Sequence, residues 1–208
     1  MCYNGLIKPP GGIHMKQSTL TTKKIVLTGL LAALTVAGSA LRITIPLDIA
    51  GTSSFHLGNI LCALSGILLG PWLGGLAAGL GSAIYDMLNP LYISECWITF
   101  LTKGAYGLVA GLIAWWGGKA WKATNGRSCL KAYLATIAGA LAYAALYLFK
   151  SYFYSGILLS GLTHKAALLN VVAKLPATTF NAVIAVVGAP LLAIAISKAL
   201  EKSHLTLE

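Results

Sequence analysis

Acidic residues are scarce in this 208-residue sequence, which holds five aspartates and glutamates against fifteen lysines and arginines. Charged residues of both signs make up 10% of the chain, whereas soluble domains carry about 25%. Proton relays in membranes depend on acids placed within the spans, and Asp86 is the one strong candidate for such a position. The composition therefore argues against a proton relay and against a soluble globular protein.

The sequence also lacks the short motifs of common catalytic sites. It contains no glycine-rich phosphate loop, no HExxH and no GxSxG in a suitable context, so we expect neither ATP hydrolysis nor zinc chemistry. The cysteines Cys2, Cys62, Cys96 and Cys129 are scattered and predict neither a disulfide framework nor a metal site. We accordingly expect no metal, no cofactor and no catalytic residue in this chain.

Hydrophobic residues, by contrast, account for 57% of the chain, and the mean hydropathy is +0.79. At about 20 residues a span, this length predicts an all-α integral membrane protein with a six-transmembrane-helix bundle in one domain, residues 22–202. Residues 1–21 and 203–208 are predicted to be polar tails. The first apolar run is expected to be a retained helix rather than a signal peptide, because no cleavage-site pattern follows it.

The net charge of +10 would suggest nucleic-acid binding in a soluble chain, but here the basic residues cluster at the ends of apolar segments. This is the positive-inside arrangement of membrane proteins. With six spans the clusters fall on one side, which predicts cytoplasmic N and C termini and no nucleic-acid partner. The clusters are Lys16, Lys23 and Lys24 before the first span, Lys119, Lys122, Arg127 and Lys131 in one loop, and Lys198 and Lys202 after the last span.

Proline, glycine and polar stretches divide the apolar residues into six spans. Pro176 is predicted to open the last span, where its missing N–H costs nothing, after a moderately apolar outer segment over 155–174. The first outer loop, residues 42–55, alternates apolar and polar residues, and it is expected either to fold over the bundle as a lid or to form a short interfacial strand or turn. The predicted spans cover residues 24–41, 56–69, 72–88, 96–116, 132–153 and 176–196.

Small residues recur at four-residue spacing in several of these spans, a pattern that lets helices approach closely in lipid. Two such lines follow the tight turn at Gly70 and Pro71. They are Gly74, Ala78 and Ser82, and Gly75, Gly79 and Ala83. A third line in the first span, Gly29, Ala33 and Ala37, is expected either to pack inside the bundle or to form a docking face for another membrane subunit.

Two opposite charges are predicted inside neighbouring spans. Asp86 lies near the outer end of the third span, and a rise of about 1.5 Å per residue places Lys103 about 12 Å below the outer boundary in the fourth. A lysine side chain extends several ångströms toward water, so the two groups can meet. Two interpretations remain open: a structural ion pair, or a lysine that faces a polar cavity and binds a substrate oxygen.

The fifth span carries Tyr143, Tyr147, Lys150 and Tyr154 at the helical spacing i, i+4, i+7 and i+11. Tyrosines near a membrane interface often form only an aromatic belt, but a lysine in line with them favours a site that stacks a ring and pairs with an anion or carbonyl. The outer half has a positive bias from Arg42, Lys103, Lys150, Lys165 and Lys174, which favours an electron-rich ligand. The candidate substrate contacts are His56, Asn59, Asp86, Trp97, Lys103, Tyr143, Tyr147, Lys150 and Asn181.

The succession of these segments resembles the S components of energy-coupling factor (ECF) vitamin importers over residues 22–202. The resemblance rests on the small-residue first helix, the long outer loop, the hairpin from HLGN to LLGPWLGGLAAGLGS, and the segments YDML, LTKGAYGLVAGLIA and KLPATTFNAVIAVVGAPLL. It implies a six-helix bundle in a prokaryotic plasma membrane, with a vitamin site near the outer surface gated by the first outer loop. It further implies that Gly29, Ala33 and Ala37 contact a membrane-embedded coupling subunit, which joins two ABC ATPases that supply the energy.

Two other classes of function stay open at this point. A stand-alone secondary carrier of a small solute would show inverted repeats, and no convincing repeat relates the two halves of the chain. A membrane-embedded enzyme would need a reactive pair at one depth, for which Asp86 and Lys103 are the candidates.

Overall fold

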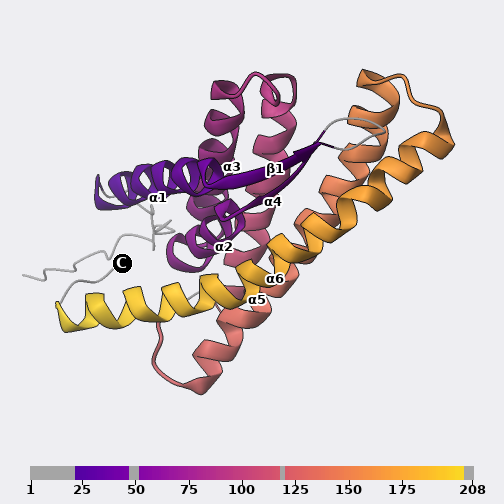
Figure 1. Cartoon of the computed structure of the whole chain (residues 1–208). Helices are drawn as coiled ribbons and strands as arrows, with labels where there is room; N and C mark the ends of the chain where they lie inside the picture. Colours follow the sequence, from indigo (N-terminus) through magenta and orange to yellow (C-terminus); the bar gives the residue numbers. More distant parts are fainter. Residues whose placement is uncertain (1–21, 47–51, 118–119, 204–208) are drawn as a thin grey trace, which may run out of the picture.

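The computed structural model describes residues 22–46, 52–117 and 120–203. The predicted tail at residues 1–21 therefore lies outside the described residues. Within them the chain forms six α-helices, one β-hairpin and two short segments of other helical types (Figure 1). In chain order the elements are α1 (Thr22–Ala40), β1 (Arg42–Pro46), β2 (Thr52–His56), α2 (Gly58–Leu69), α3 (Pro71–Leu88), the 3-10 helix η1 (Ile93–Glu95), α4 (Cys96–Ala114), α5 (Gly126–Lys150), the π-helix η2 (Ser151–Leu159) and α6 (His164–Lys202).

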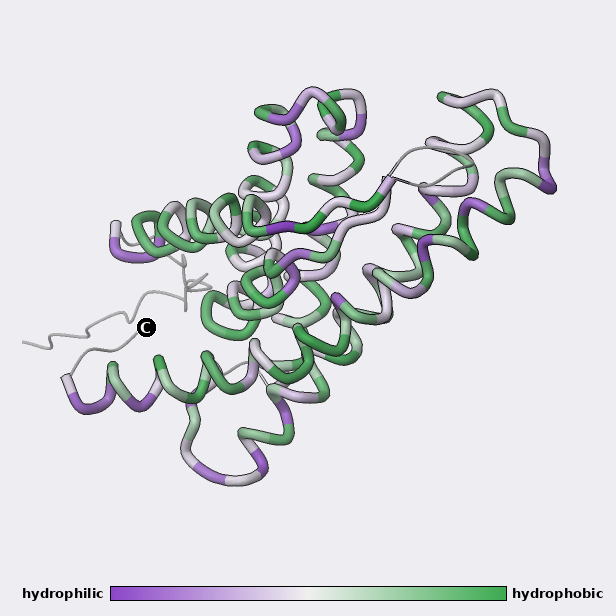
Figure 2. Tube along the Cα trace, viewed as in Figure 1, coloured by the Kyte–Doolittle hydropathy of each residue, from purple (hydrophilic) through white to green (hydrophobic). Residues whose placement is uncertain are grey.

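Four helical segments are long and apolar enough to cross a membrane, namely α1, η1 with α4, α5 with η2, and α6. The helix α2 is shorter, with 12 residues, and α3 has 18 residues but is less apolar than those four segments. Figure 2 shows hydrophobic residues along most of the helices. The prediction of a helical membrane protein is confirmed, except that the first outer loop contains strands, and the number of spans stays a prediction.

The predicted boundary of the last span is wrong. Pro176 lies inside α6, which begins at His164, and residues 151–159 continue from α5 as a π-helix. The side chain of Thr163 starts α6 because it accepts a hydrogen bond from the backbone N–H of Ala166. Proline removes one hydrogen bond from the ladder, a loss that a membrane helix packed against its neighbours tolerates.

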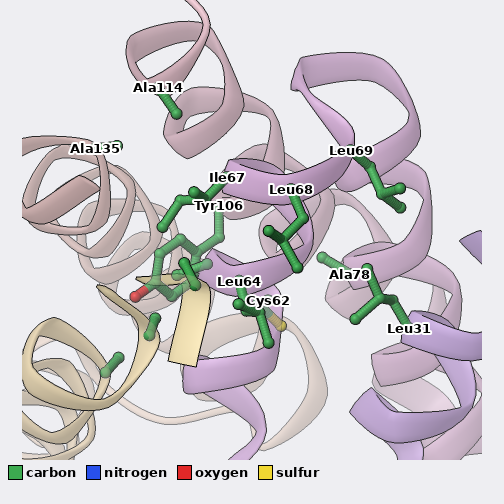
Figure 3. Packing of buried hydrophobic residues seen from close by; sticks show 14 of the residues in the cluster. Leu31, Cys62, Leu64, Ile67, Leu68, Leu69, Ala78, Tyr106, Ala114 and Ala135 are labelled. Carbon is green, nitrogen blue, oxygen red and sulfur yellow. The ribbon is translucent and has the colours of Figure 1, made fainter. Parts of the chain in front are cut away.

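Close backbone contact between α2, α3 and α4 forms the centre of the bundle. A Cβ atom added at Gly74 would lie 2.5 Å from the Cα of Gly66 in α2, and one added at Gly107 would lie 2.7 Å from the carbonyl oxygen of Gly74. Gly70 joins α2 to α3 with a φ of 81°, a conformation that favours glycine. The predicted close packing along this small-residue line is thus confirmed, and Figure 3 shows side chains such as Leu64, Ile67 and Tyr106 filling the neighbouring core.

The first helix α1 has two different small-residue faces. Ala32, Thr35 and Ser39 are buried, and a Cβ at Gly81 of α3 would lie 2.7 Å from Thr35, so this face packs on the bundle. Gly29, Ala33 and Ala37 are exposed on the other side. The predicted line of small residues therefore does not pack inside the bundle and stays exposed along α1.

The first outer loop forms an antiparallel hairpin in which Arg42 pairs with His56 and Pro46 with Thr52. In Figure 1 the hairpin extends from the end of α1 toward the region of α5 and α6. The alternating apolar residues of this segment thus form a short strand, the second of the two alternatives from the sequence. Its β2 strand also lines the cavity described next, as a lid would.

Candidate ligand-binding site

A polar cavity of about 250 Å³ lies at the end of the bundle that carries the hairpin. Its walls come from the end of α1, both strands, α3, the segment leading into α4, α4, α5, η2 and α6. All its lining residues are polar, charged or tyrosine except Leu91, Leu159 and Ala177. Because the rest of the bundle is strongly apolar, a polar space of this size is suited to a small molecule with several hydrogen-bonding groups.

A ladder of stacked tyrosines forms one wall of the cavity. Tyr106 of α4 stacks on Tyr143 of α5 at 5.7 Å between ring centroids and 17° between planes, and Tyr143 stacks on Tyr147 at 5.7 Å and 27°. Tyr106 is completely buried in the core, whereas Tyr143 and Tyr147 line the cavity. The ladder offers aromatic surface to a planar ligand group.

Lys103 of α4 lies against this ladder, buried and 4.1 Å from the ring centroid of Tyr143. Its Nζ donates a hydrogen bond to Oδ1 of Asn59 in α2, which orients the side chain. Asp86 of α3 lines the same cavity, but no Asp86–Lys103 ion pair forms in the described part of the chain. The geometry therefore agrees with a lysine that faces a polar cavity, the second of the two interpretations from the sequence.

Lys150 lines the cavity next to Tyr147 and forms an ion pair with Glu95, at 2.5 Å between Nζ and Oε2. The other carboxylate oxygen of Glu95 accepts a hydrogen bond of 2.5 Å from Ser155 of η2. This cluster joins the start of α4 to the end of α5. Replacing Lys150 would leave a half-buried carboxylate without its cation, so such a variant would test packing as much as ligand contact.

The π-helix η2 changes which residues follow Lys150 on the cavity wall. A continuous α-helix would place Tyr154 on this face, as the sequence predicts. In the wider turn of a π-helix, Ser151, Ser155 and Leu159 line the cavity instead. Tyr154 turns away, donates to the backbone oxygen of Ser94 and accepts a hydrogen bond from Trp97.

The hairpin is held over the cavity by side chains from two sides. Asn181 of α6 accepts a hydrogen bond from the backbone N–H of His56 at 3.0 Å and donates one to the backbone oxygen of Ser54 at 2.8 Å. The hydroxyl of Tyr92 contacts the hydroxyls of Thr52 and Ser54 at 2.9 and 3.0 Å. The hairpin is therefore held by hydrogen bonds to side chains of α6 and of the segment between α3 and η1.

His56, at the end of β2, lines the cavity and has a buried ring nitrogen. Its Nδ1 is buried and has no hydrogen-bond partner among the described residues. Burial lowers the pKa of His56 well below its usual range, and the positive charges of Lys103 and Arg42 lower it further. The ring is thus neutral near pH 7, so it can accept a hydrogen bond as well as donate one.

Replacing Asn181 by leucine is expected to free the hairpin while the helices stay folded. The change removes two hydrogen bonds to the backbone of β2, each worth about 1 kcal/mol, so amide exchange at His56 should become about tenfold faster or more. Hydrogen-exchange mass spectrometry of peptides over residues 42–56 measures this. Thr179→Ala, an exposed change on the same helix, is the control, and equal exchange in both variants would contradict the role of Asn181.

Most of the predicted contacts meet at the cavity, and two do not. His56, Asp86, Lys103, Tyr143, Tyr147, Lys150 and Asn181 line it. Asn59 only supports Lys103, and Trp97 is exposed and bonded to Tyr154. Sequence reasoning missed Arg42, Tyr92, Glu95, Ser151, Asn170 and Lys174 as lining residues. Glu95 had a usable signal, because an acid beside a span is notable in a chain with only five.

Comparisons with known proteins add independent information. A family model described as "ECF-type riboflavin transporter, S component" matches residues 19–198. A Pyrococcus woesei protein described as "Uncharacterized protein in gap 3'region" is 35% identical over 115 residues, which are 55% of this chain and 70% of that protein. A "UPF0397 protein" of Streptococcus gordonii is 34% identical over 96 residues, which are 46% of this chain and 49% of that protein. The matched part thus spans about half the length of the second relative.

Proposed function

This chain belongs to the family of ECF-type riboflavin transporter S components, and we propose that it binds a small vitamin or vitamin-like micronutrient with high affinity and carries it across the membrane. As an S component, it acts as a transport substrate-binding subunit rather than an enzyme. In this proposal the energy comes from two ABC ATPases on other chains, joined to this one by a membrane-embedded coupling subunit.

The observation that carries the proposal is the polar cavity in an otherwise apolar bundle. Its tyrosine ladder provides a surface for a planar ring, and Lys103 stands beside that surface. Hydroxyl groups from the hairpin, η2 and α6 surround the remaining space. Such a site binds a molecule that combines an aromatic or heterocyclic part with polar substituents.

The proposed orientation places the cavity toward the outside of a prokaryotic plasma membrane and both termini in the cytoplasm. Lys23 and Lys24 lie at the start of α1, whereas the hairpin and the cavity follow its other end. The basic residues Lys198 and Lys202 lie at the end of α6. Positive charges concentrate on the cytoplasmic side of membrane proteins, which supports this orientation and a six-span arrangement.

The exposed face of α1 is the proposed contact with the coupling subunit. Gly29, Ala33 and Ala37 form a line of small residues on this face, between the exposed side chains of Val26 and Leu30, and no described part of the chain lies within 4 Å of a Cβ added at Gly29. Small residues allow two helices to approach closely in a membrane.

Replacing Ala33 or Ala37 by tryptophan is expected to block assembly with the coupling subunit and to spare ligand binding, because both residues lie outside the cavity lining on the exposed face of α1. Co-purification with a tagged coupling subunit measures assembly. Leu141→Trp, which introduces the same side chain at an exposed position of α5, should assemble normally. Wild-type recovery of the Ala33 and Ala37 variants would remove this face from the interface.

Transport in vesicles tests the whole proposal. Riboflavin is the first ligand to examine, because the matched family model is named for it, and mass spectrometry of small molecules released from the purified protein extends the search. Uptake should require the coupling subunit and hydrolysable ATP. Uptake by the purified chain alone would instead show a secondary carrier, and chemical conversion of the ligand would show an enzyme.

A further inference from the structure

Lys174 of α6 is a buried cation that lines the cavity without an anionic partner among the described residues. Its exposed fraction is 6%, and no hydrogen bond or ion pair to its ammonium group occurs in the residues that the structure describes. Glu95 is the acid on its side of the cavity, but both oxygens of that carboxylate are occupied, by Lys150 and by Ser155. A buried charge is costly unless something pairs with it, so this position indicates a ligand.

Two further buried polar groups near Lys174 also lack partners among the described residues. Oδ1 of Asn170 and Oγ of Ser151 make no hydrogen bond of normal geometry in the described residues, although the two residues are 1% and 0% exposed, and Ser151 has only an electrostatic interaction with the Tyr147 side chain. Both residues line the cavity. Unsatisfied buried polar atoms are rare in folded proteins, and each needs an explanation such as a missing ligand or water.

The packing of η2 against α6 brings these groups together. A Cβ added at Gly156 would lie 3.2 Å from Ala167, which sets the register of the two antiparallel segments. Ser151 precedes Gly156 in η2, and Asn170 follows Ala167 in α6. Because the two segments are antiparallel, both residues lie on the same side of this contact. Lys174 lies one helical turn beyond Asn170, and its Nζ is 6.0 Å from the ring centroid of Tyr147.

The charges of the whole lining agree with this local picture. The cavity lining has four basic residues and two acidic ones. The charges of Lys150 and Glu95 neutralise each other in an ion pair. Asp86 then remains as the only acid against Arg42, Lys103 and Lys174 among the described lining residues. The free cavity therefore carries an excess of positive charge.

We propose that Lys174, Asn170 and Ser151 form a subsite for an anionic group of the ligand, a carboxylate or a phosphate. This inference rests on the proposed function, because it assigns the chemical class of the transported molecule. Lys174 pairs with the negative charge, the Ser151 hydroxyl donates a hydrogen bond to it, and the Asn170 amide can turn to present its NH₂ group. The ring of the same ligand lies against Tyr143 and Tyr147.

Matched pairs of compounds, in which one member is neutral and the other carries an anionic group, test the subsite on the full-length protein in lipid nanodiscs. The pairs are riboflavin and flavin mononucleotide, nicotinamide and nicotinate, and biotinamide and biotin. In the pair that binds, the anionic member should bind about tenfold more tightly or better, as for a hydrogen bond to a charged group. Lys174→Met should abolish this preference. Lys165→Met, at an exposed position of the same helix, should keep it.

The possible outcomes separate the inference from the proposed function. A neutral member that binds as tightly as its anionic partner, or a preference that survives in Lys174→Met, would overturn the subsite and leave a vitamin-binding S component in place. If no pair binds and mass spectrometry finds no small molecule retained by the purified protein, the proposed function falls together with the subsite. An anionic compound released from wild-type protein and absent from Lys174→Met would support both.

Discussion

Replacing Gly107 by valine is expected to prevent the bundle from folding. A Cβ at this position would lie 2.7 Å from the backbone oxygen of Gly74 and 3.0 Å from the Cβ of Ala78. Overpacking costs about 1–3 kcal/mol where side chains can adjust, and here the obstacle is the backbone of α3, so the cost should reach or exceed the top of that range. Most of the protein should then be lost from the monodisperse peak in size-exclusion chromatography, and any remainder should melt at a lower temperature.

Gly29→Val is the matched control for this prediction. It makes the same chemical change in another membrane helix, at a position where a Cβ meets nothing within 4 Å in the described part of the chain. It should purify and melt like the wild type. Equal stability of the two valine variants would show that α3 and α4 are not as close as the structure places them.

Replacing Lys103 by methionine is expected to remove most ligand binding while the protein stays folded. Methionine is apolar and similar in length, so it can fill the buried space beside Tyr143 without a charge. A hydrogen bond to a charged group contributes about 1.5–3 kcal/mol, which corresponds to a loss of affinity of about 10- to 100-fold. The amount of small molecule retained through purification, measured by mass spectrometry after denaturation, reports the effect whichever ligand the protein carries.

Lys131→Met provides the control for the loss of one positive charge. Lys131 lies outside the cavity lining and donates its hydrogen bond to the backbone oxygen of Trp116, in the loop after α4. Its variant should retain the wild-type amount of ligand. Full retention by Lys103→Met, with a normal elution profile, would remove this lysine from the binding site.

The two lysines of the cavity illustrate how far sequence reasoning extends. The sequence identifies Lys103 because a charge in the middle of an apolar span is unusual, whatever surrounds it. Lys174 enters the sequence prediction only as part of a general positive bias, because residues 155–174 resemble an outer segment, whereas the structure places Lys174 within α6. A wrong helix boundary therefore hides the cation on which the anionic subsite depends.

The same limit applies to the residues after Lys150. The spacing of Tyr143, Tyr147 and Lys150 correctly predicts a shared face, since α-helical periodicity holds as far as the end of α5. It fails at Tyr154, where the chain continues as a π-helix. No local sequence pattern predicts this change, and the π-helix makes contacts with distant parts of the chain, such as that between Ser155 and Glu95, 60 residues apart.

The amino-acid sequence alone determined that this protein is a helical membrane protein and that its central helices pack closely. Hydropathy determines whether a segment lies in lipid or in water, and glycine and proline affect the backbone conformation at their own positions. Both properties are therefore local in the sequence. The tertiary structure alone decided which polar side chains share one cavity and which of its cations lack an anionic partner among the described residues. Those facts depend on the register between helices far apart in the chain, as where Asn181 meets β2 across more than a hundred residues.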